Sequence, residues 1–333
     1  MKYMLKNIPS ICPACCSKKG KLLFEINSHD AAISQVKKNK YSILKKEIES
    51  IWGGNKCKVI RCDVCYFVYS IPHKSGTEKY YSIIYDNLQY PTWRKEYNLI
   101  LNNIKKLQNK NIKYLEVGAG NGVFAKKVAD IIGKHNVTCF EFSDKSIEEI
   151  KNHGLTCFNK DIKKFKTKDK FSVICFFSVL HHMDNPNLIF KKLSEIVDND
   201  GRIYIATTPE ESIAFMETQI NAIAYPPTHV GRWNRLSLKK LGDRHGFSIE
   251  EYTLYYPTLL QSLKDIAFWK YSQKTKESQS LASKIASIKN NLIRKSFSLF
   301  LLLPFAASSL PSAIRRKKFP SSQLICLKKS KSQ

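Results

Sequence analysis

The distribution of apolar and polar positions changes near residue 111. From there to about residue 256, short apolar runs typical of buried strands alternate with segments whose apolar residues recur every three or four positions, as in amphipathic helices. The expected strands cover residues 113–117, 137–142, 171–177, 201–207 and 247–255. This alternation predicts a largely parallel α/β sheet with helices on both faces and a ligand at the carboxyl ends of its strands.

The same pattern divides the chain into four parts. A last strand is expected at residues 323–328, antiparallel to the strand at 247–255 and close to it. The parts are a small module over 1–72, an aromatic linker or lid helix over 73–110, the sheet domain over 111–256 with 321–329, and a helical insertion over 257–320. We expect the insertion to leave and rejoin the sheet on its ligand side.

Four of the ten cysteines form two pairs with a two-residue spacer, Cys12 with Cys15 and Cys62 with Cys65. A tight turn with this spacing directs two thiolates at one tetrahedral Zn²⁺, and two such turns complete a closed site. Because four thiolates leave no open coordination position, we predict a structural zinc ion. Strand-like segments at 21–26 and 66–71 favour a zinc ribbon, with an inserted helix over 31–52. Cys16 and Cys57 are alternative ligands.

Composition excludes some classes of protein. With 43% apolar and 25% charged residues, the chain can bury a core and is not intrinsically disordered. The longest apolar run, residues 296–310, is short for a membrane span and contains Pro304, so we expect no transmembrane helix. The first ten residues lack the continuous apolar segment of a secretory signal, and we expect a cytoplasmic protein.

The chain is strongly basic, with 55 Lys and Arg against 28 Asp and Glu. This excess is dispersed, as on a solvated surface, so nucleic acid is the less favoured partner. Basic residues also flank the apolar stretch 297–307, in a predicted helix over 281–295 and in the run 315–318. Basic residues around a short apolar segment are typical of interfacial anchors. Residues 281–318 are therefore expected either to touch an anionic membrane, at its inner face, or to cap the domain.

Acidic residues stand at the ends of three successive strands of the predicted sheet. Glu116 lies just before a turn with Gly118 and Gly120, whose spacing differs from the dinucleotide-binding fingerprint. A carboxylate there suits a ligand with a cationic amino-acid end. Glu141 can accept hydrogen bonds from both hydroxyls of a ribose, and Asp161 can accept one from an exocyclic adenine amine.

These segments resemble the motifs of class I S-adenosylmethionine-dependent methyltransferases. Residues 115–122 are similar to motif I of that family, and the matches to the later strands are residues 140–144, 159–161, 176–184 and 199–209. The resemblance implies a seven-stranded Rossmann-like sheet that binds S-adenosyl-L-methionine. It also implies contacts to that cofactor, with Glu116, Gly118 and Gly120 around the methionine moiety, Glu141 at the ribose, Asp161 at the adenine and Ser178 near the sulfonium.

The cysteine pairs, with Trp52-Gly-Gly and Arg61 between them, resemble the zinc-bearing front of a bacterial methyltransferase group linked to glycan and natural-product genes. The reaction implied is methyl transfer to oxygen or carbon of a small-molecule or glycan acceptor, lipid-linked acceptors included. The end of the fourth strand lacks the Asn/Asp-Pro-Pro-aromatic turn whose carbonyls would hold an exocyclic base amine, which disfavours amino methylation of adenine or cytosine. Two alternatives stay open, namely methylation of RNA at another position, and a regulatory protein that binds the cofactor without catalysis.

Three histidines are the candidate catalytic bases. His181 and His182 follow the fourth strand, and His229 ends a Tyr-Pro-Pro-Thr-His segment that follows the fifth. An oxygen or carbon nucleophile benefits from proton removal, and an imidazole with its ordinary pKa can act as the base near neutral pH. We also expect one of the adjacent histidines to be structural.

Overall fold

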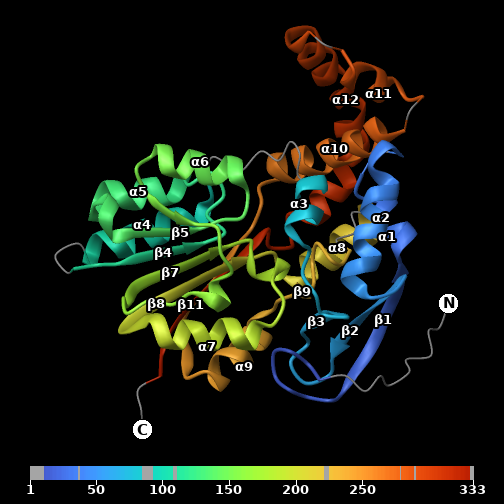
Figure 1. Cartoon of the computed structure of the whole chain (residues 1–333). Coiled ribbons are helices and arrows are strands. Elements are labelled where there is room, and N and C mark those ends of the chain that lie inside the picture. The colour runs from blue at the N-terminus through green and yellow to red at the C-terminus, as the bar shows by residue number, and fades with distance from the viewer. Residues whose placement is uncertain are drawn as a thin grey trace.

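The chain folds around two β-sheets that lie side by side (Figure 1). The computed structural model describes residues 11–36, 38–84, 93–107, 111–220, 225–277, 279–288 and 290–330. The larger sheet has seven strands in the order β10-β11-β8-β7-β4-β5-β6. They are β4 (Tyr114–Val117), β5 (Val137–Phe140), β6 (Thr156–Phe158), β7 (Phe171–Phe177), β8 (Val197–Thr207), β10 (Phe247–Tyr255) and β11 (Ser322–Lys329).

The last strand closes the larger sheet as predicted. Strand β11 lies between β8 and β10 and runs antiparallel to both, whereas β4, β5, β6, β7 and β8 pair in parallel. Helices cover both faces of the sheet (Figure 1). One face carries α4 (Lys95–Leu107), α5 (Val123–Ile132) and α6 (Asp144–Asn152), and the other carries α7 (Pro186–Ile196) and α9 (Arg235–Arg244). The predicted seven-stranded α/β class is confirmed.

The smaller sheet joins the N-terminal segment to the sheet domain. Its order is β1-β2-β3-β9, with β1 (Gly20–Asn27), β2 (Lys56–Cys62), β3 (Val68–Ile71) and β9 (Gly231–Arg232), and it is accompanied by α1 (Ser28–Ile33) and α2 (Lys38–Trp52). The sequence predicted β1, β3 and one helix but missed β2. Because β9 pairs with β3 and the Phe67 ring lies 4.0 Å from the buried Trp233 ring, the two sheets share one hydrophobic core.

The segment over 73–110 contains α3 (Glu78–Ile84) and α4. Two of its aromatic side chains are packed inside the protein. Tyr80 is fully buried, and the Tyr97 ring stacks on Phe124 with the ring centres 4.2 Å apart. Trp93 is 42% exposed. Residues 85–92, which include two tyrosines of the expected lid, lie outside the described residues.

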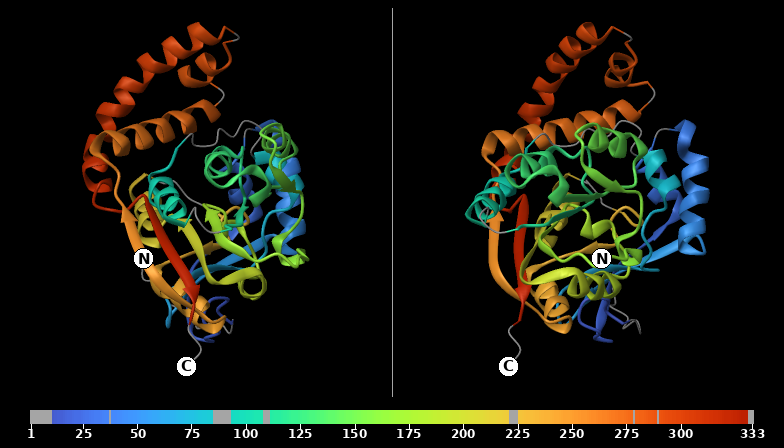
Figure 2. Two further views of the ribbon diagram at one scale, coloured as in Figure 1. Left: turned by 90° about the vertical axis from the view of Figure 1, so that its left-hand side faces the viewer. Right: turned by 60° about the vertical axis from the view of Figure 1, so that its left-hand side comes forward.

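The insertion before β11 is helical and projects away from the rest of the molecule (Figure 2). It contains α10 (Leu259–Lys276), α11 (Leu281–Ala286) and α12 (Asn291–Arg316). The helix expected over 281–295 is therefore split between α11 and α12. Pro304 was expected to interrupt the apolar run, and this is wrong, because α12 continues through it. A proline removes one helical hydrogen bond, and on an exposed helix water can satisfy the freed carbonyl.

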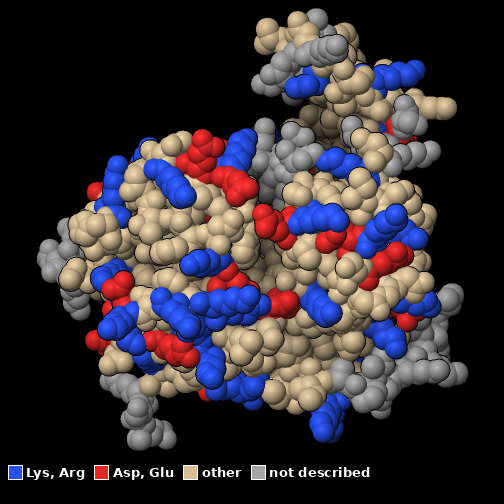
Figure 3. Space-filling model, viewed as in Figure 1, with Lys and Arg blue, Asp and Glu red and all other residues tan. Residues whose placement is uncertain are grey.

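Continuity of α12 also changes the expectation about membrane spans. Within the described residues, one stretch, Ser296–Arg316, is long and apolar enough to cross a bilayer by length and composition alone, and only 12% of it is buried in the protein. Lys and Arg side chains are scattered over the visible face of the molecule and do not form a single stripe (Figure 3).

Candidate functional site

The glycine-rich turn after β4 has backbone conformations that favour glycine. Gly118, Gly120 and Gly122 all have positive φ, at 71°, 55° and 74°. A Cβ atom on Gly118 would lie 2.7 Å from Cγ2 of Val179, which follows β7. A Cβ atom on Gly122 would instead meet Ile150 of α6 at 2.8 Å, so that glycine serves helix packing. Gly118 thus lets the turn after β4 pack closely against the segment that follows β7.

Two predicted acidic residues lie beside this turn. Glu116 is 2% exposed and accepts a hydrogen bond of 2.9 Å from the Tyr114 hydroxyl. Burial raises the pKa of Glu116 to about 8, with a further contribution from the charge of Glu141. Glu141 accepts from the backbone N–H of Gly120 at 2.8 Å and of Phe142 at 2.8 Å. A cationic group beside Glu116 would restore its charge, so the site suits a ligand with an ammonium or sulfonium.

The other predicted cofactor residues lie at the same edge of the sheet, because β4, β5, β6 and β7 are neighbours that run in parallel. Asp161 accepts from the backbone N–H of Lys163 at 2.9 Å and pairs with its ammonium at 3.2 Å. Ser178 directly follows β7, has a φ of 55°, and accepts a hydrogen bond of 2.9 Å from Arg94. The glycine turn, the three carboxylates and Ser178 therefore lie along one edge of the sheet, at the carboxyl ends of neighbouring parallel strands, which is where a sheet of this kind binds its ligand.

Arg94 is a site residue that the sequence did not reveal. It immediately precedes α4, donates to Ser178, and its charge lowers the pKa of Glu116 against the larger effect of burial. In a chain with 55 Lys and Arg, a single arginine in an aromatic segment carries no distinguishing signal.

The three predicted histidines meet beyond the end of β7. His181 and His182 belong to the 3₁₀ turn η3 (Leu180–His182), and their ring centres lie 4.4 Å and 4.9 Å from that of His229. His182 Nδ1 lies 2.5 Å from the carbonyl oxygen of Thr228. Burial lowers the pKa of all three, that of His182 to about 4. They are therefore neutral at pH 7 and weaker bases than free imidazole.

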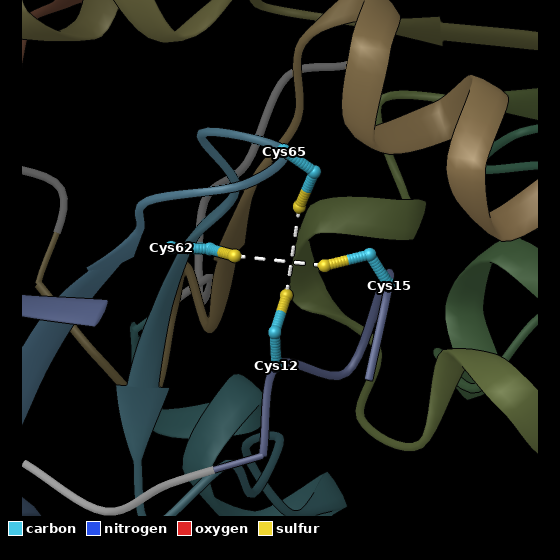
Figure 4. A group of neighbouring side chains, drawn as sticks. All are labelled: Cys12, Cys15, Cys62 and Cys65. Carbon is cyan, nitrogen blue, oxygen red and sulfur yellow. Dashed lines mark hydrogen bonds between the residues drawn. The ribbon is translucent and has the colours of Figure 1, made fainter. Parts of the chain in front are cut away.

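The four predicted zinc ligands also come together (Figure 4). Each sulfur lies within 4.8 Å of the others, with Cys12 3.6 Å from Cys65 and Cys15 3.5 Å from Cys62. A Zn–S bond of about 2.3 Å places the sulfurs of a tetrahedral site roughly 3.8 Å apart, so the cluster fits zinc. Neither alternative ligand belongs to this cluster. Cys16 is exposed, and Cys57 is buried in a separate core beneath α2.

The backbone of the cysteine turns is tied to the helices of the larger sheet. Asn187 of α7 donates to the carbonyl of Pro13 at 2.9 Å, and Arg244 of α9 donates to that of Ala14 at 2.9 Å. Asn234, which caps α9, donates to the carbonyl of Cys65 at 3.2 Å. The cluster thus lies where the N-terminal sheet docks on α7 and α9, which is a structural position.

The strand order and the antiparallel last strand of the larger sheet are those of the fold of class I S-adenosylmethionine-dependent methyltransferases. Residues 90–252 match the family model described as a methyltransferase domain. The protein is thus an enzyme of this class, which agrees with the resemblance seen in its sequence motifs.

Several solved structures are similar to this chain. An O-methyltransferase from Brevibacillus brevis, in complex with S-adenosyl-L-homocysteine, is 17% identical, with a TM-score of 0.41, over 71% of this chain and 75% of that one. A phosphoethanolamine N-methyltransferase 2 from Haemonchus contortus is 15% identical, with a TM-score of 0.48, over 77% and 58%. Coclaurine N-methyltransferase is 12% identical, with a TM-score of 0.45, over 72% and 75%. No curated protein matches the chain in sequence.

Proposed function

We propose that the protein methylates an oxygen or carbon atom of a small-molecule or glycan acceptor. The observation that carries this proposal is the group of three imidazoles beyond the end of β7, His181, His182 and His229 (the histidine group), because imidazoles can hold and orient a hydroxyl. S-adenosylmethionine, when bound, supplies an electrophilic methyl group on a sulfonium. In this proposal the residues of the chain bind and orient that cofactor. Glu116 lies at its cationic end, Glu141 at the ribose and Asp161 at the adenine. Arg94 holds Ser178 in position through its hydrogen bond.

A cavity of about 600 Å³ between the N-terminal module and the insertion supports an acceptor with a sugar-like body. Its lining includes Tyr225, Trp269 and Phe305, together with Lys270 and Lys274 and the carboxylate of Asp30. Aromatic faces suit sugar rings, and ammonium groups suit phosphate or carboxylate substituents. Tyr225 begins a turn in which its carbonyl accepts a hydrogen bond of 3.1 Å from the N–H of Thr228. This turn leads directly to His229 of the histidine group. A bound acceptor could therefore extend from this cavity towards the strand ends.

Labelled methyl transfer tests the proposal. Purified protein with methyl-labelled S-adenosylmethionine is offered lipid, glycan and RNA fractions in parallel. We expect label in the glycan or lipid-linked glycan fraction. Label confined to RNA would overturn the acceptor class, and cofactor binding without transfer to any fraction would favour the regulatory alternative.

We also propose that residues 281–318 contact an anionic membrane. Large apolar side chains on α12 are exposed to solvent, among them Leu292 at 79%, Phe300 at 72% and Leu303 at 64%. Basic residues lie at both ends of the apolar stretch 297–307, Arg294 before it and Arg315 after it. Burial of apolar side chains and attraction to anionic lipid add in such a segment. The alternative is that residues 281–318 pack as a cap on the sheet domain or against a second copy of the chain.

Vesicle flotation tests this membrane contact. The wild-type protein is expected to float with vesicles that contain anionic lipid and not with neutral ones. Phe300→Asp and Leu303→Asp should each lower the bound fraction at least about tenfold, because each removes roughly 2 kcal/mol of apolar burial. Leu188→Asp, at an exposed apolar position on α7, is the matched control and should bind as wild type. Wild-type protein that stays unbound on anionic vesicles would contradict the proposal.

A further inference from the structure

The histidine group could bind a metal ion through nitrogen ligands, whereas the cysteine cluster would bind one through sulfur. One nitrogen from each of His181, His182 and His229 lies within 4.8 Å of the other two. The histidines come from two segments that are tied together, since the N–H of Val230 donates to the carbonyl of His181 at 3.0 Å. In the described part of the chain, no carboxylate or thiol joins this group.

Hydrogen bonds orient one of these rings as in known metal sites. The Thr228 carbonyl can only accept, so the Nδ1 of His182 facing it carries the proton and Nε2 keeps its lone pair. Metal-bound histidines commonly donate their second ring nitrogen to a backbone carbonyl in this way. The contact therefore leaves His182 ready to act as a ligand through Nε2.

The second observation concerns His229. Its Nδ1 atom is buried and, among the described residues, has no hydrogen-bond partner. An unsatisfied buried nitrogen costs roughly 1–3 kcal/mol and calls for an explanation such as an unfilled ion site. Packing of aromatic rings alone would leave that cost in place.

We infer that His181, His182 and His229 bind a divalent first-row transition metal ion such as Zn²⁺. Three neutral imidazoles with an open fourth position are a ligand set that zinc uses in catalytic sites, in contrast to a closed four-thiolate site. The inference rests on the proposed function in one respect, namely that a hydroxyl of the acceptor would take the open fourth position. A hydroxyl bound to such an ion loses its proton to water more readily.

The two metal sites should differ in strength. The histidine group offers three neutral nitrogen ligands, whereas the cysteine cluster offers four sulfurs that bind a divalent cation as thiolates. Four anionic ligands that close the coordination shell hold such an ion more firmly than three neutral ligands with an open position. The histidine-bound ion is therefore expected to leave first when a chelator is added.

Metal analysis of the full chain tests the inference. Wild-type protein loaded with Zn²⁺ and freed of excess metal is expected to hold two equivalents, one of which a mild chelator removes first. His182→Gln and His229→Gln should each lose that labile equivalent and keep the other. Loss of an outer-shell partner lowers metal affinity roughly 10- to 100-fold, and loss of a direct ligand should lower the affinity for the labile ion by more than this. His135→Gln, at an exposed histidine outside the cluster, should keep both. One equivalent in wild type as in the variants would overturn the site.

A second measurement does not depend on the folding of any variant. Titration of zinc-loaded wild-type protein, after removal of the labile equivalent, with Co²⁺ should produce the visible absorption of a nitrogen-ligated ion without thiolate charge-transfer bands. Absence of this absorption would overturn the inference. The labelled-transfer assay distinguishes failure of the metal site from failure of the proposed function. Methyl transfer by wild-type protein that binds only one zinc ion would contradict the metal site and leave the proposed function intact. Binding of the second ion without any methyl transfer would contradict the proposed function and leave the metal site intact.

Discussion

Replacing Glu116 with Gln is expected to weaken the binding of S-adenosylmethionine about 10- to 100-fold and, at pH 8, to make the cofactor-free protein more stable. The loss of affinity follows from removal of a buried carboxylate at the cationic end of the ligand. The gain in stability follows from the environment of Glu116, which is 2% exposed and has a pKa raised to about 8 by burial.

The sign of the pH dependence can be stated. Between pH 4.5 and 8 the unfolded chain has ionised Glu116, whereas the folded chain still holds its proton, so stability falls as the pH rises through this window. The fall is about 1.4 kcal/mol for each pH unit. After allowance for burying an amide, Glu116→Gln should gain about 1–3 kcal/mol at pH 8 and little at pH 5.

Urea unfolding at pH 5 and pH 8 without cofactor, together with calorimetry of cofactor binding, measures both effects. Glu148→Gln is the matched control, because Glu148 is exposed on α6 and should change neither quantity. An equal loss of stability at both pH values, or unchanged affinity for the cofactor, would contradict the assigned role of Glu116.

Replacing Cys62 with Ser is expected to abolish zinc binding at the cysteine cluster and to destabilise the whole chain by at least about 3 kcal/mol, because structural zinc contributes roughly 10–16 kcal/mol in isolated finger peptides. The effect should reach the sheet domain, since the cysteine turns are tied to α7 and α9 through Asn187 and Arg244. We expect one broad transition at lower temperature in a calorimetric scan.

The matched control for this prediction is Cys16→Ser, because Cys16 is exposed and lies outside the cluster. It should keep both its zinc content and its unfolding temperature. A Cys62→Ser protein that unfolds as wild type, or a zinc-free wild-type protein of unchanged stability, would show that the cluster does not stabilise the fold through a metal ion.

Much of the larger sheet was predictable because buried parallel strands are nearly continuous apolar runs. Strands β7 and β10 lie at the residues expected, and the short final segment was placed as β11 because such a sheet needs an antiparallel closing strand. Local sequence also located the acidic strand ends, since Glu116 lies within β4, Glu141 directly follows β5, and Asp161 lies three residues after β6. These features depend on residues that are neighbours in the chain.

The features that were missed depend on tertiary context. The residues around Pro304 predict that a helix is interrupted there, but α12 continues through this proline. Strand β2 exists because β1 and β3 lie on either side of it, and its own residues gave only a weak alternation beside two cysteines. The meeting of His229 with His181 and His182 requires a turn 46 residues further along the chain, and the contact of Arg94 with Ser178 spans 84 residues.

The two-residue pairing of β9 with β3 ties the N-terminal segment to the histidine group. Strand β9 begins at Gly231, two residues after His229, so the position of His229 depends on a sheet whose strands β2 and β3 are connected through the turn of Cys62 and Cys65. We therefore expect removal of the first 72 residues to leave the glycine turn and the acidic strand ends in place but to displace His229. A chain shortened in this way should still bind the cofactor and should lose the proposed acceptor site.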